Sequence, residues 1–257
     1  MNTLSSNGIT NVAAITLLVA GMVIAGWFLP PGLNVLVVML AMIALLGLLG
    51  ITVTKNLCGV LISDRNLMSL ARFQMATWTV VVLGAYLTFA LMRIKNQAPD
   101  PLNITIDWHL WTLLGISTTS LVGAPLILST KKDRQPAATV APKTAQQVNE
   151  PEANINANRQ GTLYANAQIG DARITDMFQG DALTNTAQID LAKVQMFYFT
   201  IIALVAYVVS IVRQLQGGYS DLGALPVLPD GLVAILGISH GGYLVSKSIN
   251  HTQSQNQ

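Results

Sequence analysis

Residues 73–92 read FQMATWTVVVLGAYLTFALM and contain no charged side chain between Arg72 and Arg93. An α-helix rises about 1.5 Å per residue and the hydrocarbon core of a bilayer is about 30 Å thick, so about 20 apolar residues cross it. Backbone groups in lipid must find hydrogen-bond partners within their own segment, and a helix provides them. The stretch therefore predicts a membrane-spanning helix over residues 70–92.

Other apolar stretches of similar length predict further spans, at residues 11–29, 33–54, 109–129, 191–213 and 230–248. The last of them is the least apolar. Only 10% of the 257 residues are charged, whereas a soluble domain has about 25%. We expect an all-α polytopic membrane protein with about six transmembrane helices. The first charged side chain is Lys55, so the first stretch is expected to be a retained helix, with a cleaved signal peptide as the alternative.

An internal repeat covers two pairs of predicted spans. The sequence SLARFQM at 69–75 matches DLAKVQM at 190–196, and Tyr86 matches Tyr207 at the same offset. The string LGIS, which begins at Leu114, recurs from Leu236. We expect two helical hairpins that run in the same direction and are related by an axis along the membrane normal, as in membrane proteins built from parallel repeats.

The chain divides accordingly into five expected segments. They are an N-terminal transmembrane hairpin at 1–56, a first repeat hairpin at 57–130, a flexible cytoplasmic linker at 131–160, a cytoplasmic segment with a short amphipathic helix at 161–189, and a second repeat hairpin with a C-terminal tail at 190–257. The linker is predicted from composition, because residues 131–160 are rich in Ala, Pro, Asn, Gln and Thr and have few large apolar side chains to bury.

The sequence DARITDMF at 171–178 places Ile174, Met177 and Phe178 on one helical face. This pattern predicts a short amphipathic helix that lies on the membrane or binds a partner. The alternative is a loop packed over the cytoplasmic ends of the third and fifth spans. Three aspartates within residues 171–181 argue against electrostatic binding to anionic lipid.

Each repeat begins with residues that suit a helix start at the membrane surface. Ser69 and Asp190 are good N-cap residues, because their side chains accept hydrogen bonds from the first backbone N–H groups. Long cations one turn later are expected to reach the lipid headgroups. The expected interfacial set is Arg72, Lys193, Gln74 and Gln195.

Small residues follow the returning helices at helical spacing, at Gly115, Thr119, Gly123, Gly237 and Gly241. Such stripes let helix backbones approach closely in lipid. We therefore expect spans four and six to pack tightly, either on each other or across the subunit interface of a homo-oligomer.

Polar side chains lie near the middle of the same two spans, at Ser117, Thr118, Ser120, Ser239 and His240. One interpretation is a path for a solute or an ion, with His240 as a proton-titrating group. In the structural interpretation, which we favour, the hydroxyls bond to the helix backbone and His240 is neutral with a partner on a neighbouring helix. No Asp or Glu lies inside any of the predicted spans apart from Asp230, the first residue of the last one, which disfavours coupled transport.

Basic residues predict the orientation of the chain. With six spans, one side holds Arg93, Lys95 and Arg213, and the other side holds all the remaining Lys and Arg residues. Loops rich in Lys and Arg stay in the cytoplasm. Both termini and residues 131–189 are therefore expected in the cytoplasm.

The sequence has no pattern typical of catalysis or of a bound cofactor. It contains no phosphate-binding loop, no nucleophile elbow and no metal-spaced His or Cys cluster, and Cys58 is its one cysteine. The net charge of +2 is too small to favour nucleic acid. We expect no cofactor, no metal and no enzymatic activity. A site on the outer face that contains Asp107 and Asp230 is the alternative.

Several strings carry a resemblance to known proteins: ISDRN at 62–66, SLARFQM at 69–75 and LGISTTSLVG at 114–123, with residues 190–196 and 236–243. Together they resemble a group of uncharacterised bacterial multi-pass membrane proteins. The resemblance implies a bacterial inner membrane and assigns no functional residue.

Two non-enzymatic functions fit these observations. The first is a structural or assembly component in the lipid bilayer, homo-oligomeric, which anchors or signals to a cytoplasmic protein partner through residues 130–190. The second is a channel or passive pore lined by spans four and six.

Overall fold

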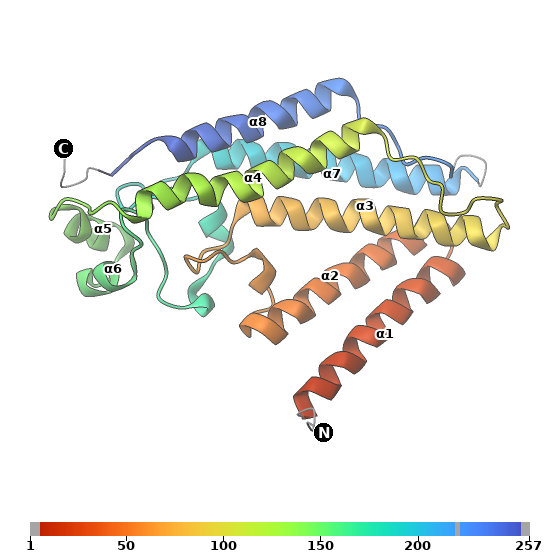
Figure 1. The fold of residues 1–257 in the computed structure, drawn as a ribbon, viewed down its shortest axis with the longest axis horizontal. Helices are drawn as coiled ribbons and strands as arrows, with labels where there is room; N and C mark the ends of the chain where they lie inside the picture. Colours follow the sequence, from red (N-terminus) through yellow and green to blue (C-terminus); the bar gives the residue numbers. More distant parts are fainter. Residues whose placement is uncertain (1–5, 219–221, 253–257) are drawn as a thin grey trace. The chain divides into compact units, whose positions relative to one another are not determined.

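The computed structural model describes residues 6–218 and 222–252 of the chain, and this part is helical with irregular connections. Its α-helices are labelled in Figure 1. They are α1 (Ser6–Phe28), α2 (Leu33–Thr54), α3 (Leu70–Lys95), α4 (Trp108–Lys132), α5 (Val140–Val148), α6 (Glu152–Asn158), α7 (Leu191–Gln216) and α8 (Asp230–Ser248). The all-α prediction is confirmed for these residues.

Five helices in the described residues are long and apolar enough to cross a membrane, namely α1, α2, α3, α4 and α7. The chain is thus a multi-pass integral membrane protein. The sixth predicted span, 230–248, forms helix α8, but α8 is not among the helices that are apolar enough to cross a membrane. Its sequence includes Asp230, His240 and Lys247, which lower its hydropathy.

The chain forms two compact units. Unit 1 comprises Met1–Val60, Ala76–Thr112 and Ile202–Asp230, and unit 2 comprises Leu61–Met75, Leu113–Ile201 and Gly231–Gln257. Helices are present at both copies of the predicted repeat, since α3 and α4 correspond to α7 and α8. The superposition of the two hairpins stays a prediction.

In unit 1, α1 and α2 lie side by side as a hairpin, as Figure 1 shows. The turn between them contains Pro30 and Pro31, which cannot continue a helix. Gly32 then adopts a φ of 89°, a conformation that glycine tolerates best. The Asn34 side chain accepts hydrogen bonds from the N–H groups of Gly32 at 3.0 Å and Val35 at 2.8 Å. These contacts explain the tight turn that the sequence indicates.

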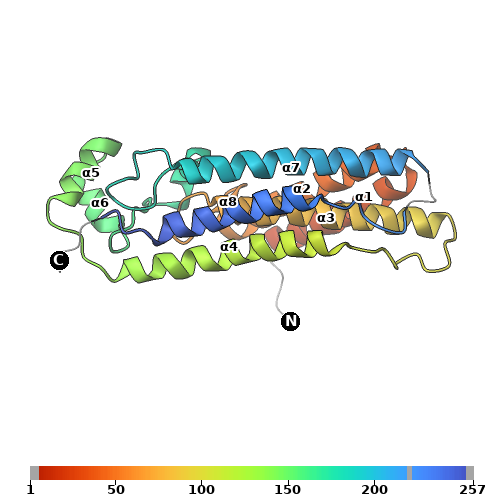
Figure 2. The same cartoon turned by 90° about the horizontal axis from the view of Figure 1, so that it is seen from above.

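In unit 2, the two expected N-caps are formed. The Ser69 hydroxyl accepts a long hydrogen bond of 3.5 Å from the Arg72 N–H at the start of α3. The Asp190 carboxylate accepts bonds from Ala192 at 3.0 Å and Lys193 at 3.3 Å at the start of α7. Within this unit, α8 runs beside α4 (Figure 2).

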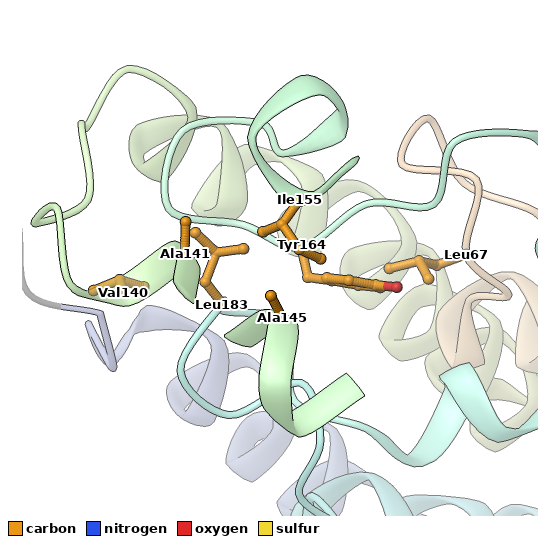
Figure 3. Packing of buried hydrophobic residues seen from close by; sticks show 7 residues of the cluster. All are labelled: Leu67, Val140, Ala141, Ala145, Ile155, Tyr164 and Leu183. Atoms are coloured by element: carbon orange, nitrogen blue, oxygen red, sulfur yellow. The ribbon is translucent and has the colours of Figure 1, made fainter. Parts of the chain in front are cut away.

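Residues 131–160 are not an unstructured linker, so that prediction is wrong. They form α5 and α6, which pack on a core that also includes Leu67, Tyr164 and Leu183. Figure 3 shows these side chains around α5. The buried face of α5 has Val140, Ala141, Thr144 and Ala145, at helical spacing. Composition did not predict this fold, because the buried face of α5 is made mostly of small residues. The larger side chains of Leu67, Tyr164 and Leu183, which complete the core, lie outside residues 131–160.

Residues 171–178 form short 3₁₀ turns instead of an amphipathic α-helix, at Ile169–Asp171 (η2) and Ile174–Phe178 (η3). The Asp176 carboxylate explains the tight η3 turn, because it accepts hydrogen bonds from the N–H groups of Arg173 at 2.8 Å and Met68 at 3.1 Å. This arrangement corresponds to the packed-loop alternative.

Of the three predicted partner-binding side chains, Met177 is 2% exposed and Phe178 packs on the same cluster, which contains Leu70 and Met196. Only Ile174 remains strongly exposed, at 63%. Two of the three are therefore used for packing within the chain.

Candidate functional site

Four charged side chains meet in the interior of unit 2, and we call them the Asp181 cluster: Asp181, Arg65, Lys193 and Lys247. One oxygen of Asp181 pairs with the Arg65 guanidinium. The other lies 2.6 Å from the Lys247 Nζ and 3.2 Å from the Lys193 Nζ. The Asp181 side chain is 12% exposed, and the three cations are 5–7% exposed. One carboxylate thus serves three buried cations.

The four members come from parts of the chain that are far apart in the sequence. Arg65 lies in the loop before α3, Lys193 in the first turn of α7 and Lys247 in the last turn of α8. Asp181 lies in segment 131–189, the name used below for these residues. The Arg65 guanidinium also donates to the backbone carbonyls of Tyr164 and Asp181, both at 3.1 Å. The cluster therefore fastens segment 131–189 to the ends of two helices.

Neighbouring backbone contacts strengthen this attachment. The amide groups of Asn66 and Asn166 donate to each other's backbone carbonyls, at 3.0 and 2.9 Å. The Thr162 N–H donates to the Lys131 carbonyl at the end of α4, at 3.2 Å. Gly161 beside it has a φ of 61° and lies against the same helix end. Residues 161–166 are thus bound to the loop before α3 and to the C-terminus of α4.

Electrostatics in the cluster favour the charged carboxylate. Burial by itself would raise the pKa of Asp181, but Lys193, Lys247 and Arg65 outweigh it and hold that pKa well below its usual 3.8. The Lys247 Nζ also lies 4.8 Å from the centre of the Tyr243 ring, a cation–π contact. A buried carboxylate with this many cationic partners stays ionised at neutral pH.

The structure separates the expected interfacial residues. Arg72 and Gln195 are exposed, in agreement with an interfacial position. Lys193 is 4% exposed and binds Asp181 and the Gln179 carbonyl, so it does not extend toward headgroups. Gln74 is fully buried, and its amide donates to the Thr200 hydroxyl. Helical periodicity could not reveal these differences, because they depend on which face of each helix is covered.

The midplane residues lie mostly inside unit 2. The Ser120 hydroxyl and the His240 Nδ1 are 2.7 Å apart, which links α4 to α8. Ser117, Ser239 and His240 are buried, with exposures of 0%, 5% and 3%. Thr118 is exposed, and its hydroxyl donates to the Leu114 carbonyl at 2.7 Å. The His240 partner on a neighbouring helix and the backbone bond of Thr118 are as the structural interpretation expects, whereas the buried Ser117 and Ser239 hydroxyls have no hydrogen-bond partner among the described residues.

The small-residue stripes only partly face the contact between α4 and α8. A methyl group on Gly123 would lie 3.5 Å from Leu244, and one on Gly237 would lie 3.6 Å from Ile116. Thr119 is exposed on α4. Gly115 and Gly241 have no other side chain within 4 Å of such a methyl group. The two helices pack on each other, while part of each stripe faces outward.

Sequence reasoning missed three members of the Asp181 cluster as a site, namely Asp181, Arg65 and Lys247. Their only signal is a set of basic residues near predicted helix ends together with an aspartate in a connecting segment. Sequence reasoning did consider Asp107 and Asp230, and both of them bond to the His109 ring in unit 1. Among the described residues, no group of His, Cys, Asp or Glu side chains could hold a metal ion.

Comparisons of the chain with protein-family profiles, with curated proteins and with solved structures give no match. Five apolar helices support a multi-pass membrane protein, and no family is identified.

Proposed function

We propose that this chain is a non-enzymatic structural or assembly component of a bacterial inner (cytoplasmic) membrane, and that segment 131–189 recruits a cytoplasmic protein partner. The observation that supports this proposal best is the Asp181 cluster, which fastens a folded segment to the ends of α7 and α8. A flexible linker that only kept a partner near the membrane would need no such attachment. A surface held in a fixed geometry binds a partner with less loss of conformational entropy.

Helix α5 offers a face for such a partner. Its buried side packs on the core of segment 131–189, and its opposite side exposes Lys143, Gln146 and Gln147. Amide and ammonium groups can form the polar rim of a protein interface. If α8 is a sixth crossing, the excess of Lys and Arg on one side is the reason to expect this face, and both termini, in the cytoplasm.

A homo-oligomer is part of the proposal. Gly115 on α4 and Gly241 on α8 have open space where a side chain would lie. Thr119, one turn after Gly115 on α4, is exposed. Small residues that face lipid let a neighbouring subunit's helix approach closely.

The channel or passive pore is the weaker alternative. It requires the midplane side chains to face water, whereas Ser117, Ser239 and His240 are at most 5% exposed and His240 bonds to Ser120. Current through reconstituted protein that is lost in His240→Ala would favour the pore over the assembly role.

Site-specific photocrosslinking in intact cells tests the recruitment. A photoreactive residue at Gln146 on α5 should capture one or a few proteins, identified by mass spectrometry. The matched control carries the same photoreactive residue in place of Leu102. This residue is 62% exposed and lies in the connection between α3 and α4, which is assigned to the other side of the membrane. Deleting residues 135–185 should abolish recruitment as well.

Two results would refute the recruitment role. One is an identical set of crosslinked proteins from Gln146 and Leu102. The other is an unchanged set of bound proteins after residues 135–185 are deleted.

A further inference from the structure

His109 lies between two carboxylates in unit 1. Its ring Nδ1 contacts an oxygen of Asp107, and its ring Nε2 contacts an oxygen of Asp230. The backbone N–H of His109 donates to the same Asp107 oxygen at 3.0 Å. The His109 side chain is 10% exposed, whereas that of Asp230 is 87% exposed. A nearly buried ring is therefore in contact with a carboxylate that water reaches freely.

The two contacts require two protons on the ring. An ionised carboxylate only accepts hydrogen bonds, so each ring nitrogen must carry an N–H to bond to it. Neutral imidazole has one N–H, and its other nitrogen would direct a lone pair at a carboxylate oxygen. The arrangement is satisfied only by the positively charged imidazolium.

The ring joins the starts of two helices. Asp107 immediately precedes α4, and Asp230 is the first residue of α8. The connections that lead to them also pair with each other, because the Thr105 N–H donates to the Gly223 carbonyl and the Leu225 N–H donates to the Thr105 carbonyl, both at 2.9 Å. The His109 contacts are the charged part of this junction.

Few other titratable groups face the ring. The Trp108 ring, which does not titrate, lies with its centre 3.7 Å from that of His109. Tyr207 of α7 interacts electrostatically with Asp107. The N–H groups of His109, first the backbone one and then the ring, lower the pKa of Asp107, so that carboxylate is negative at neutral pH. Within the part of the chain that the structure describes, the charged groups in contact with the imidazole are the two aspartates.

We propose that His109 is a proton-dependent latch that, when doubly protonated, holds the start of α8 to the start of α4. Loss of one proton leaves the ring with a single donor. The ring then keeps Asp107, which is two residues away and also holds the His109 backbone N–H, and releases Asp230. The contact between His109 and Asp230 is therefore made at low pH, where the latch is closed, and is lost as pH rises. The inference is independent of the recruitment role, which concerns unit 2.

Distance measurements between spin labels on the two connections test the latch. Labels at Leu102→Cys and Val227→Cys, both exposed positions in unit 1, would be introduced together with Cys58→Ser and studied in lipid nanodiscs. Since imidazole ordinarily titrates between about pH 5 and 8, spectra at about pH 5 and about pH 9 bracket the change. We expect a narrow distance distribution at the lower pH and its loss at the higher pH.

Variants identify the titrating group. His109→Gln carries both of its N–H donors on a single nitrogen and has no charge, so it cannot donate to the two carboxylates from opposite sides as the ring does, and the narrow distribution should be lost at both pH values. Asp230→Asn, which keeps the shape but not the charge, should weaken the response. His251→Gln alters an exposed histidine outside unit 1 and should behave as the parent does. A pH response that persists in His109→Gln, or its absence in the parent, would overturn the proposal.

A second measurement needs no substitution. Nitrogen-15 NMR of the three histidine rings, in protein labelled at histidine, reports how many ring nitrogens carry a proton. We expect the signal assigned to His109 to show two protonated nitrogens at about pH 6.5, where an ordinary imidazole is about half protonated. If the signal assigned to His109 shows a single protonated nitrogen there, the latch does not exist.

Discussion

Replacing Asp181 with asparagine should lower the free energy of unfolding by about 3–5 kcal/mol, the range measured when one partner of a buried ion pair is removed. The variant keeps the size of the side chain and removes its charge, so Arg65, Lys193 and Lys247 lose the carboxylate that they share. Buried cations without a counter-charge are costly, because no water solvates them. Denaturant unfolding in detergent micelles measures the change.

Two matched variants make this result specific. Asp133→Asn removes an exposed carboxylate in the same unit and should change stability by less than about 0.5 kcal/mol. Lys247→Gln should have an intermediate effect, since Asp181 keeps Arg65 and Lys193. If Asp181→Asn were as stable as Asp133→Asn, the cluster would not hold segment 131–189.

The same carboxylate predicts an acid dependence. The pKa of Asp181 in the folded chain lies well below 3.8, so the unfolded chain binds the proton more readily. The stabilisation is therefore complete above about pH 5 and is lost as pH falls below the ordinary value toward the folded pKa. Asp181→Asn should show a flatter stability profile than the parent over this acid range.

Replacing Gly161 with alanine should cost about 2–4 kcal/mol, the second large effect. A Cβ at this position would lie 2.3 Å from the carbonyl oxygens of both Lys131 and Lys132. The residue also has a φ of 61°, where an L-residue is disfavoured by about 1–2 kcal/mol. Backbone atoms of a helix end cannot rotate away as a side chain does, so the chain at residues 161 and 162 must shift away from the C-terminus of α4.

Gly170→Ala is the control for this substitution. Gly170 lies in η2, in the same segment, and a methyl group there meets no other atom within 4 Å. Its melting temperature should match that of the parent within about 2 °C. Equal melting temperatures for Gly161→Ala and Gly170→Ala would show that the chain at Gly161 does not lie against the C-terminus of α4.

The membrane helices could be predicted from the sequence because their cause is local. An uncharged run such as 73–92 must satisfy its backbone within itself, whatever surrounds it. The caps at Ser69 and Asp190 are local too, since each side chain bonds to N–H groups two or three residues away. Local physical chemistry thus determines where α3 and α7 begin.

The rest depends on contacts between distant residues. Arg72 and Lys193 occupy matching positions in the repeat, yet one is exposed and the other is buried beside Asp181. Their helices present different faces to the core, which the sequence of either helix alone does not reveal. Residues 131–160 likewise looked too polar to fold, because Leu67, Tyr164 and Leu183, which complete their core, lie outside that stretch.

Hydrogen exchange of the α5 backbone tests most directly whether segment 131–189 is a folded body fastened to the helices. With the full chain in lipid nanodiscs, the amides of Thr144 and Ala145, on the buried side of α5, should exchange at least about 100-fold more slowly than in an unfolded chain. The Asp181→Asn substitution should remove most of this protection. Exchange at the unfolded rate in the parent, or protection that survives Asp181→Asn unchanged, would contradict the account.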